Sequence, residues 1–112
     1  MATFAQVREL ALALPSAVEE PTWGDVTFRV NGKIFAITGT ESAHVSVKAS
    51  KEDQAELIAS DPETYSFAPY VGRFGWVLVQ LAGVGADDLR DLLTEAWRRT
   101  APKKLVKEFD AA

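Results

Sequence analysis

The most constraining feature of this chain is Asn31-Gly32, which stands between two short runs rich in β-branched and aromatic residues. The runs are Val26-Thr27-Phe28-Arg29-Val30 and Lys33-Ile34-Phe35-Ala36-Ile37. Asn-Gly readily takes the positive φ angles of a type I′ turn, whose twist matches that of two antiparallel strands. The sequence therefore predicts a β-hairpin with a two-residue loop.

A two-residue loop sets the pairing of the two strands. The expected pairs are Val30 with Lys33, Phe28 with Phe35, and Val26 with Ile37. Because side chains alternate along a strand, these pairs share one side of the hairpin, which is predicted to face the core with Lys33 at its rim. The other side is mixed and can meet water or a partner; it carries Thr27, Arg29, Ile34, Ala36 and Thr38.

The rest of the chain alternates between helical and extended patterns. Helices are predicted from a capping box at Thr3 to Pro15, from Lys51 to about Ser60, and from about Ala86 to Thr100. Further strands are predicted near residues 43–48, 64–67 and 76–81. Residues 18–23 are also extended, and Pro21 indicates an edge or a bend there.

This order of elements predicts the fold class. Consecutive hairpins imply an antiparallel sheet, and the first and last predicted helices each have one apolar face. We therefore expect an α+β two-layer sandwich of about five strands with helices on one face. The expected order is helix, three or four strands, helix, one or two strands, helix. A single domain spans residues 1–112, with about 101–112 as a mobile tail.

Composition excludes several classes of protein. There is no cysteine, no basic N-terminal region typical of a signal peptide, and no apolar run long enough for a membrane span, so a cytoplasmic protein without a membrane partner is expected. The net charge of −4 disfavours nucleic-acid binding, which depends on Lys and Arg. The C-terminal residues 98–112 are nevertheless locally basic; their cations are Arg98, Arg99, Lys103, Lys104 and Lys107.

No catalytic or metal-binding constellation is visible in the sequence. His44 is the only histidine, and it lies on the polar side of its predicted strand. A general base needs a nucleophile or an orienting carboxylate, and a zinc site needs several His or Cys ligands. We therefore predict no catalytic residue, no metal, no cofactor and no enzymatic activity.

The three tryptophans receive different interpretations. Trp97 lies on the apolar stripe of the last predicted helix, and Trp23 precedes Gly24 at a turn; both are predicted to pack. Phe74-Gly75-Trp76-Val77 resembles part of the RNP1 strand of RNA-recognition modules, in which an exposed aromatic ring stacks on a base. Trp76 therefore has two open interpretations, packing and stacking.

Several stretches together resemble the MmcQ/YjbR family of small bacterial proteins. They are Leu12-Ala13-Leu14-Pro15, Pro21-Thr22-Trp23-Gly24, Phe28 to Ala36, Val45-Ser46-Val47-Lys48, Gly75-Trp76-Val77-Leu78-Val79 and the Leu-rich helix ending in Ala96-Trp97. The resemblance implies a fold similar to frataxin (CyaY) and to type III secretion chaperones, and it implies DNA binding. Many members carry Lys and His just before the late Trp, whereas this chain has Arg73-Phe74-Gly75 there, so no role of that pair carries over.

Two functional hypotheses follow. The first is a non-enzymatic DNA-binding module that uses the open side of the sheet, the late loop and the basic tail. Its candidate contact residues are Arg29, Lys33, Lys48, Tyr70, Arg73, Trp76, Lys103 and Lys104. The alternative is a protein–protein interaction module, chaperone-like or homodimeric, without a nucleic-acid role; the same cations are then solvated ends of strands.

Overall fold

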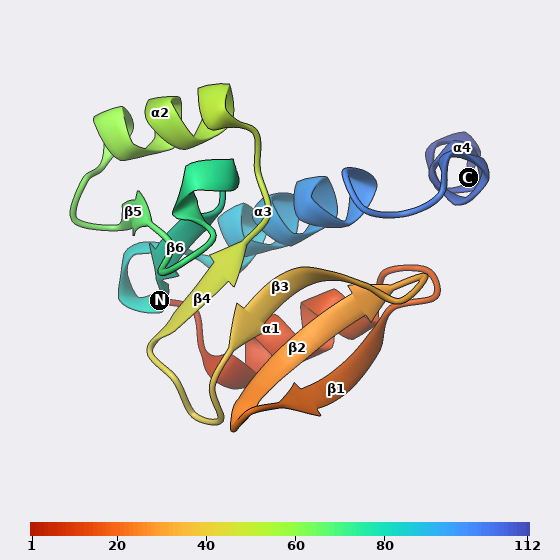
Figure 1. The fold of residues 1–112 in the computed structure, drawn as a ribbon, viewed down its shortest axis with the longest axis horizontal. Coiled ribbons are helices and arrows are strands. Elements are labelled where there is room, and N and C mark those ends of the chain that lie inside the picture. The colour runs from red at the N-terminus through yellow and green to blue at the C-terminus, as the bar shows by residue number, and fades with distance from the viewer.

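The chain folds into one antiparallel sheet with helices packed on one side of it. A computed structural model describes residues 1–112, and Figure 1 shows the arrangement. The strands lie in the order β1-β2-β3-β4-β6-β5, and every neighbouring pair is antiparallel. The elements are α1 (Phe4–Leu12), β1 (Val18–Thr22), β2 (Asp25–Val30), β3 (Lys33–Thr38), β4 (His44–Val47), α2 (Lys51–Ser60), β5 (Tyr65–Phe67), β6 (Val77–Gln80), α3 (Ala86–Arg98) and α4 (Lys103–Ala111).

The strands β2 and β3 form the predicted hairpin, and Asn31-Gly32 is its turn. Asn31 and Gly32 have φ angles of 53° and 77°, as a type I′ turn requires, and Val30 pairs with Lys33. The remaining predicted register is wrong. Phe28 pairs with Ala36, and Val26 pairs with Thr38.

A β-bulge at Phe35 causes this change of register. Arg29 pairs with Ile34 while Phe28 pairs with Ala36, so Phe35 is the extra residue on β3. Phe35 and Ala36 are both fully buried, and beyond the bulge Ile37 is only half-buried. Ile37 was predicted in the core and Ala36 outside it; the bulge exchanges their sides because one added residue shifts the period-2 alternation.

The core lies between this side of the sheet and the helices. Phe28 and Phe35 are fully buried, as predicted, together with Val45 and Val47 of β4. Helices α1 and α3 pack on each other and contribute to the same hydrophobic cluster. Trp97 of α3 is fully buried, and its indole N–H donates to the carbonyl of Pro15 at 3.0 Å, which fixes the end of the α1 segment against α3.

The sheet has six strands, close to the five expected. The extended stretch with Pro21 is β1, an edge strand, where the missing N–H of proline is tolerated. The opposite edge is the three-residue strand β5. Up to α3 the order of helices and strands follows the prediction, and the α+β two-layer architecture is confirmed.

Helix boundaries follow the capping signals. The Thr3 hydroxyl accepts from the N–H of Gln6 while the Gln6 side chain accepts from the N–H of Thr3, which completes the predicted capping box. The Ser50 hydroxyl accepts from the N–H of Asp53 at the start of α2.

Residues 101–112, expected to form a mobile tail, include a fourth helix that was not predicted from the sequence. Lys103–Ala111 form the helix α4, which places Leu105, Val106 and Phe109 against the core. The Phe109 ring lies 5.0 Å from the Trp97 ring, centroid to centroid, and Asp110 forms an ion pair with Arg98. The charged positions dominate the composition of this segment, so its apolar face was not recognised.

The loop from Ala68 to Gly75 is held by a buried polar contact. The Gln54 side chain of α2 donates to the carbonyls of Gly72 at 2.7 Å and Trp76 at 2.8 Å. Gln54 is buried, and both hydrogens of its side-chain amide find a backbone carbonyl acceptor in this segment. This contact ties the loop before β6 to α2.

Two glycines allow a matched test of this packing. Gly75 has a φ of 103°, and an added Cβ would lie 2.7 Å from the carbonyl oxygen of Ala49; Gly32 also has a positive φ, but open space surrounds its Cβ position. We expect Gly32→Ala to lower the free energy of unfolding by about 1–2 kcal/mol. Gly75→Ala should cost about 1–3 kcal/mol more, because backbone must move. Urea denaturation measures both, and equal costs would contradict the packing described.

Candidate functional site

The eight candidate residues predicted from the sequence do not form one surface. Arg29 lies on the open side of the sheet, and Lys48 lines a groove between α2 and α3. Lys33, Lys103 and Lys104 belong to the end of the molecule formed by the β2–β3 turn and α4. Tyr70 and Arg73 belong to the loop before β6, and Trp76 is the last residue before that strand.

Arg29 and Trp76 are already engaged inside the protein. The Arg29 Nε lies 2.9 Å from a Glu20 carboxylate oxygen and donates to the Thr27 hydroxyl, so this side chain joins β1 to β2. Trp76 is 8% exposed, which leaves little of its ring for stacking on a base.

The loop before β6 presents aromatic side chains beside the open side of the sheet. Tyr70 is 96% exposed and has a φ of 64°, an uncommon conformation for a bulky residue. It lines a hollow of about 250 Å³ whose wall includes Ile37, His44 and Leu78. The guanidinium of Arg73 lies 4.8 Å from the centroid of the Phe74 ring. This surface is an aromatic rim with few free cations.

Trp23 was predicted to pack, and this prediction is wrong. The side chain is 99% exposed. Trp23 and Gly24 have φ angles of 51° and 83° and form the two-residue turn between β1 and β2. The side chain of a residue in such a loop points away from the ladder, so the turn position outweighed the apolar character of the residue. The packing of Trp97 is confirmed.

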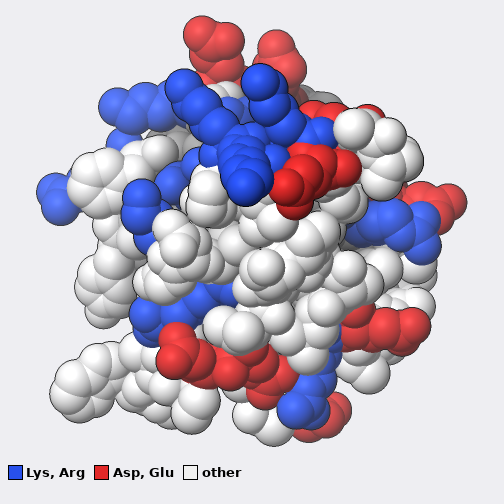
Figure 2. Space-filling model, turned by 90° about the vertical axis from the view of Figure 1, so that its right-hand side faces the viewer, with Lys and Arg blue, Asp and Glu red and all other residues white.

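The lysines form a basic end of the molecule, which we call the lysine end (Lys33, Lys103, Lys104 and Lys107). Successive residues of an α-helix lie about 100° apart around its axis. The three lysines of α4 therefore lie within an arc of about 100° on one side of the helix. That arc is opposite Leu105 and Phe109, which face the core. Asn31 of the β2–β3 turn and Lys104 line one hollow of about 370 Å³, so the turn adjoins α4. Figure 2 shows most Lys and Arg side chains in the upper half of this face, at the height of α4 in Figure 1.

Lysines and arginines of this chain have different surroundings. Five of the six arginines form ion pairs with carboxylates; they are Arg8, Arg29, Arg90, Arg98 and Arg99. None of the six lysines does. The lysine end therefore consists of cations that no carboxylate of the protein neutralises at short range.

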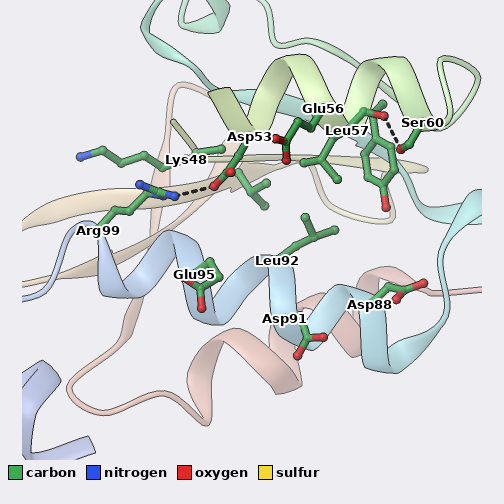
Figure 3. A pocket seen from close by; sticks show the side chains of 13 residues that line it. Lys48, Asp53, Glu56, Leu57, Ser60, Asp88, Asp91, Leu92, Glu95 and Arg99 are labelled. Atoms are coloured by element: carbon green, nitrogen blue, oxygen red, sulfur yellow. Dashed lines mark hydrogen bonds and ion pairs between the residues drawn. The ribbon is translucent and has the colours of Figure 1, made fainter. Parts of the chain in front are cut away.

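A groove of about 440 Å³ runs between α2 and α3. Its apolar lining comes from the sheet and from both helices and consists of Val47, Ala49, Leu57, Tyr65 and Leu92. Five carboxylates stand along it: Asp53, Glu56, Asp88, Asp91 and Glu95. Figure 3 shows Lys48 and Arg99 together at one end of the groove and Asp88 at the other.

Sequence reasoning missed the groove because its two walls are far apart in the chain. On α3, Asp88, Asp91 and Glu95 have the i, i+3, i+7 spacing of one helical face, which was a visible signal. Nothing in the sequence showed that this face lies opposite α2, since that placement follows from the pairing of β4 with β6.

Charges in the groove are only partly compensated. Arg99 lies 2.6 Å from Asp53, and Arg98 lies 3.4 Å from Glu95. Glu56, Asp88 and Asp91 have no ion-pair partner. No three His, Cys, Asp or Glu side chains lie close enough together to hold a metal ion. The free carboxylates are instead spread along an apolar floor.

The chemistry available in the groove is binding chemistry. Its one aliphatic hydroxyl, on Ser60, donates to the carbonyl of Leu57 at 2.7 Å and has no histidine beside it. Burial raises the pKa of the Tyr65 phenol above its usual value of 10.0, and the nearby charges of Asp88 and Asp61 raise it further. Tyr65 is therefore a neutral hydrogen-bond donor at physiological pH.

The Tyr65 phenol should titrate above pH 10. The folded protein holds this proton more tightly than the unfolded chain, so the free energy of unfolding should fall as the pH rises above about 10. The absorbance of tyrosinate in a Tyr70→Phe variant isolates Tyr65. Adding Asp88→Asn should lower the pKa only partly, because burial is the larger cause; a pKa of Tyr65 at or below 10 would contradict this geometry.

None of the helices combines the length and the apolar run of a membrane span. Among known proteins, the uncharacterized proteins Rv2570 of Mycobacterium tuberculosis (strain H37Rv) and Mb2600 of Mycobacterium bovis are each 36% identical to this chain over 98 residues. The matched part is 87% of this chain and 62% of each relative, so the chain spans less than two thirds of their length.

A solved structure and a family model are also similar to this chain. The crystal structure of Deinococcus radiodurans protein DR2400, with the domain DUF419, is similar with a TM-score of 0.79 and 25% identity. The match covers 88% of this chain and 78% of that one. The model of the YjbR family matches residues 12–99, which include every strand of the sheet. This chain therefore belongs to the YjbR family.

Proposed function

We propose that the protein is a non-enzymatic binding module that contacts the phosphates of DNA with its lysine end. The observation that carries the proposal is the stripe of Lys103, Lys104 and Lys107 on the outer side of α4, none of which has a carboxylate partner. Free lysine ammonium groups gain most from phosphate, because no internal ion pair has to be broken first.

The lysine end replaces the wider surface expected from the sequence. Arg29 is held by Glu20, and Trp76 is buried, so neither supports a contact with bases. Lys33 supports the proposal through its place next to the β2–β3 turn, whose Asn31 shares a hollow with Lys104. Contacts of this kind position a protein on the backbone without reading sequence.

The acidic remainder of the protein limits and orients such binding. The net charge is −4 although the lysine end alone carries four positive charges. The body of the protein therefore repels DNA while one end attracts it. We infer a small footprint of about three phosphates, one for each lysine of α4, which corresponds to a slope of roughly −2.7 of log K against log salt for duplex DNA.

Fluorescence anisotropy with labelled duplex DNA tests this footprint. Affinity should fall about 40-fold between about 50 and 200 mM salt. Lys103→Gln with Lys107→Gln removes two of the three contacts, so affinity should fall and the remaining dependence should be only about 3–4-fold.

The matched control removes two positive charges elsewhere. Arg8→Gln with Arg90→Gln changes the net charge equally, at side chains more than half exposed. This variant should keep the salt slope of the original protein. No binding at about 50 mM salt, a flat salt response, or equal losses in both double variants would refute the DNA proposal.

One observation favours a protein-interaction module as the second candidate. Trp23 and Tyr70 expose nearly all of their surface, and Trp and Tyr are enriched where proteins contact one another. Pairing through the β1 edge is disfavoured, because Glu19, Glu20 and Pro21 lie along it. The turn with Trp23 and the loop with Tyr70 are therefore a better contact surface for a second copy of the chain than the β1 edge.

Light scattering across a range of protein concentrations tests this candidate. Self-association through the aromatic surface should give a mass above 12.2 kDa that rises with concentration. Trp23→Ser should lower it without loss of stability, because the side chain makes almost no internal contact. A mass of one chain at every concentration argues against a homodimer.

A further inference from the structure

We propose that the groove between α2 and α3 is a binding site for a small organic cation, in which an ammonium or guanidinium group is attached to an apolar body. This site lies apart from the lysine end and does not depend on the proposal for DNA. The inference rests on the shape of the groove, its apolar floor and the distribution of its charges.

The size and lining of the groove suit a small molecule. Its volume of about 440 Å³ is within the range of about 300–1,000 Å³ that is usual for ligand sites. Leu57 of α2 and Leu92 of α3 face each other across the groove, and Val47 of the sheet also lines it. An apolar body placed there would cover surface that the fold leaves open to water.

The charges select a cation. Arg99 compensates Asp53, and Arg98 compensates Glu95, whereas Glu56, Asp88 and Asp91 have no cationic partner. In Figure 3 Glu56 comes from α2, while Asp88 and Asp91 come from α3 on the opposite side. A ligand between the helices therefore meets uncompensated carboxylates from both walls, and a charge-assisted hydrogen bond to them is stronger than a neutral one.

The groove also has a direction. Lys48 and Arg99 stand at one end and disfavour a cation there, while Asp88 marks the other end. Tyr65 lies in the lining near the Asp88 end, and its hydroxyl remains protonated at physiological pH. The ammonium group is therefore placed toward Asp88 and Asp91, with the apolar body over Leu57 and Leu92.

The carboxylates of the groove do not form a metal site. Stabilisation of the start of α3 does not account for all of them either. They do not converge as a set of metal ligands. Asp87 and Asp88 both occupy the first turn of α3, where negative charge stabilises the helix. Only Asp88 lines the groove, since the Asp87 side chain is 94% exposed and pairs with Arg90. This difference provides a matched pair of variants.

The probe is 4-phenylbutylamine, compared with 4-phenylbutyrate, which has the same apolar body and the opposite charge. Binding is followed by the amide chemical shifts of the full chain at about 150 mM salt, where diffuse attraction between exposed charges is screened. We expect the shifts of Leu57, Tyr65 and Leu92 to change, and the amine to bind at least tenfold more tightly than the carboxylate.

Variants then separate the site from general acidity. Asp88→Asn should weaken amine binding, and adding Asp91→Asn should bring the loss to about tenfold, which corresponds to about 1.4 kcal/mol. Asp87→Asn should leave amine binding unchanged within about twofold. Leu92→Gln should also weaken it, because it removes the apolar contact without changing charge. Spermidine, a polycation without an apolar body, should bind more weakly than 4-phenylbutylamine.

Four results would overturn the proposal. Three concern the ligands: shifts spread over the acidic surface rather than the groove, equal binding of amine and carboxylate, and spermidine binding as tightly as the amine with no effect of Leu92→Gln. Equal effects of Asp87→Asn and Asp88→Asn would also overturn it, because general charge or helix stability would then explain the loss.

Discussion

The burial of Phe28 and Phe35 against α1 and α3 is the interaction on which the rest of the structure depends. Both rings are fully buried, and the bulge at Phe35 allows Ala36 to enter the core beside them. The helices cover this side of the sheet, and the loop carrying Tyr70 borders a hollow on the opposite side. Trp97 completes the arrangement through its contact with Pro15 and supports α4 through Phe109.

The pairing of β4 with β6 determines where the molecule can bind a ligand. This ladder joins residues 44–47 to residues 77–80 and places the following helix α3 opposite α2. The two helices do not close on each other, so Leu57 and Leu92 line a groove instead of a packed interface. The apolar floor and its carboxylates are therefore consequences of a long-range strand pairing, not of any local motif.

Most arginines of this protein form internal ion pairs and the lysines do not, which explains how an acidic protein retains a basic end. Arg29 and Arg98 connect elements of the fold through carboxylates, a role for which the planar guanidinium is well suited. The lysines take no part in this network, and those of α4 share its outer face. Net charge describes the whole surface, while a partner responds to the local distribution.

The sequence by itself determined the local elements: the Asn31-Gly32 turn, the capping box at Thr3 and the apolar stripe of α3 all follow from short-range chemistry. It also determined the two-layer class and the burial of Phe28 and Phe35, because alternation decides which side is apolar. Only the tertiary structure decided the bulge at Phe35, since one extra residue reverses the sides of Ala36 and Ile37 without changing composition. Contacts between residues distant in the chain decided the rest: α4 packs on Trp97 through Phe109, Trp76 is buried, and the carboxylates of α2 and α3 line one groove.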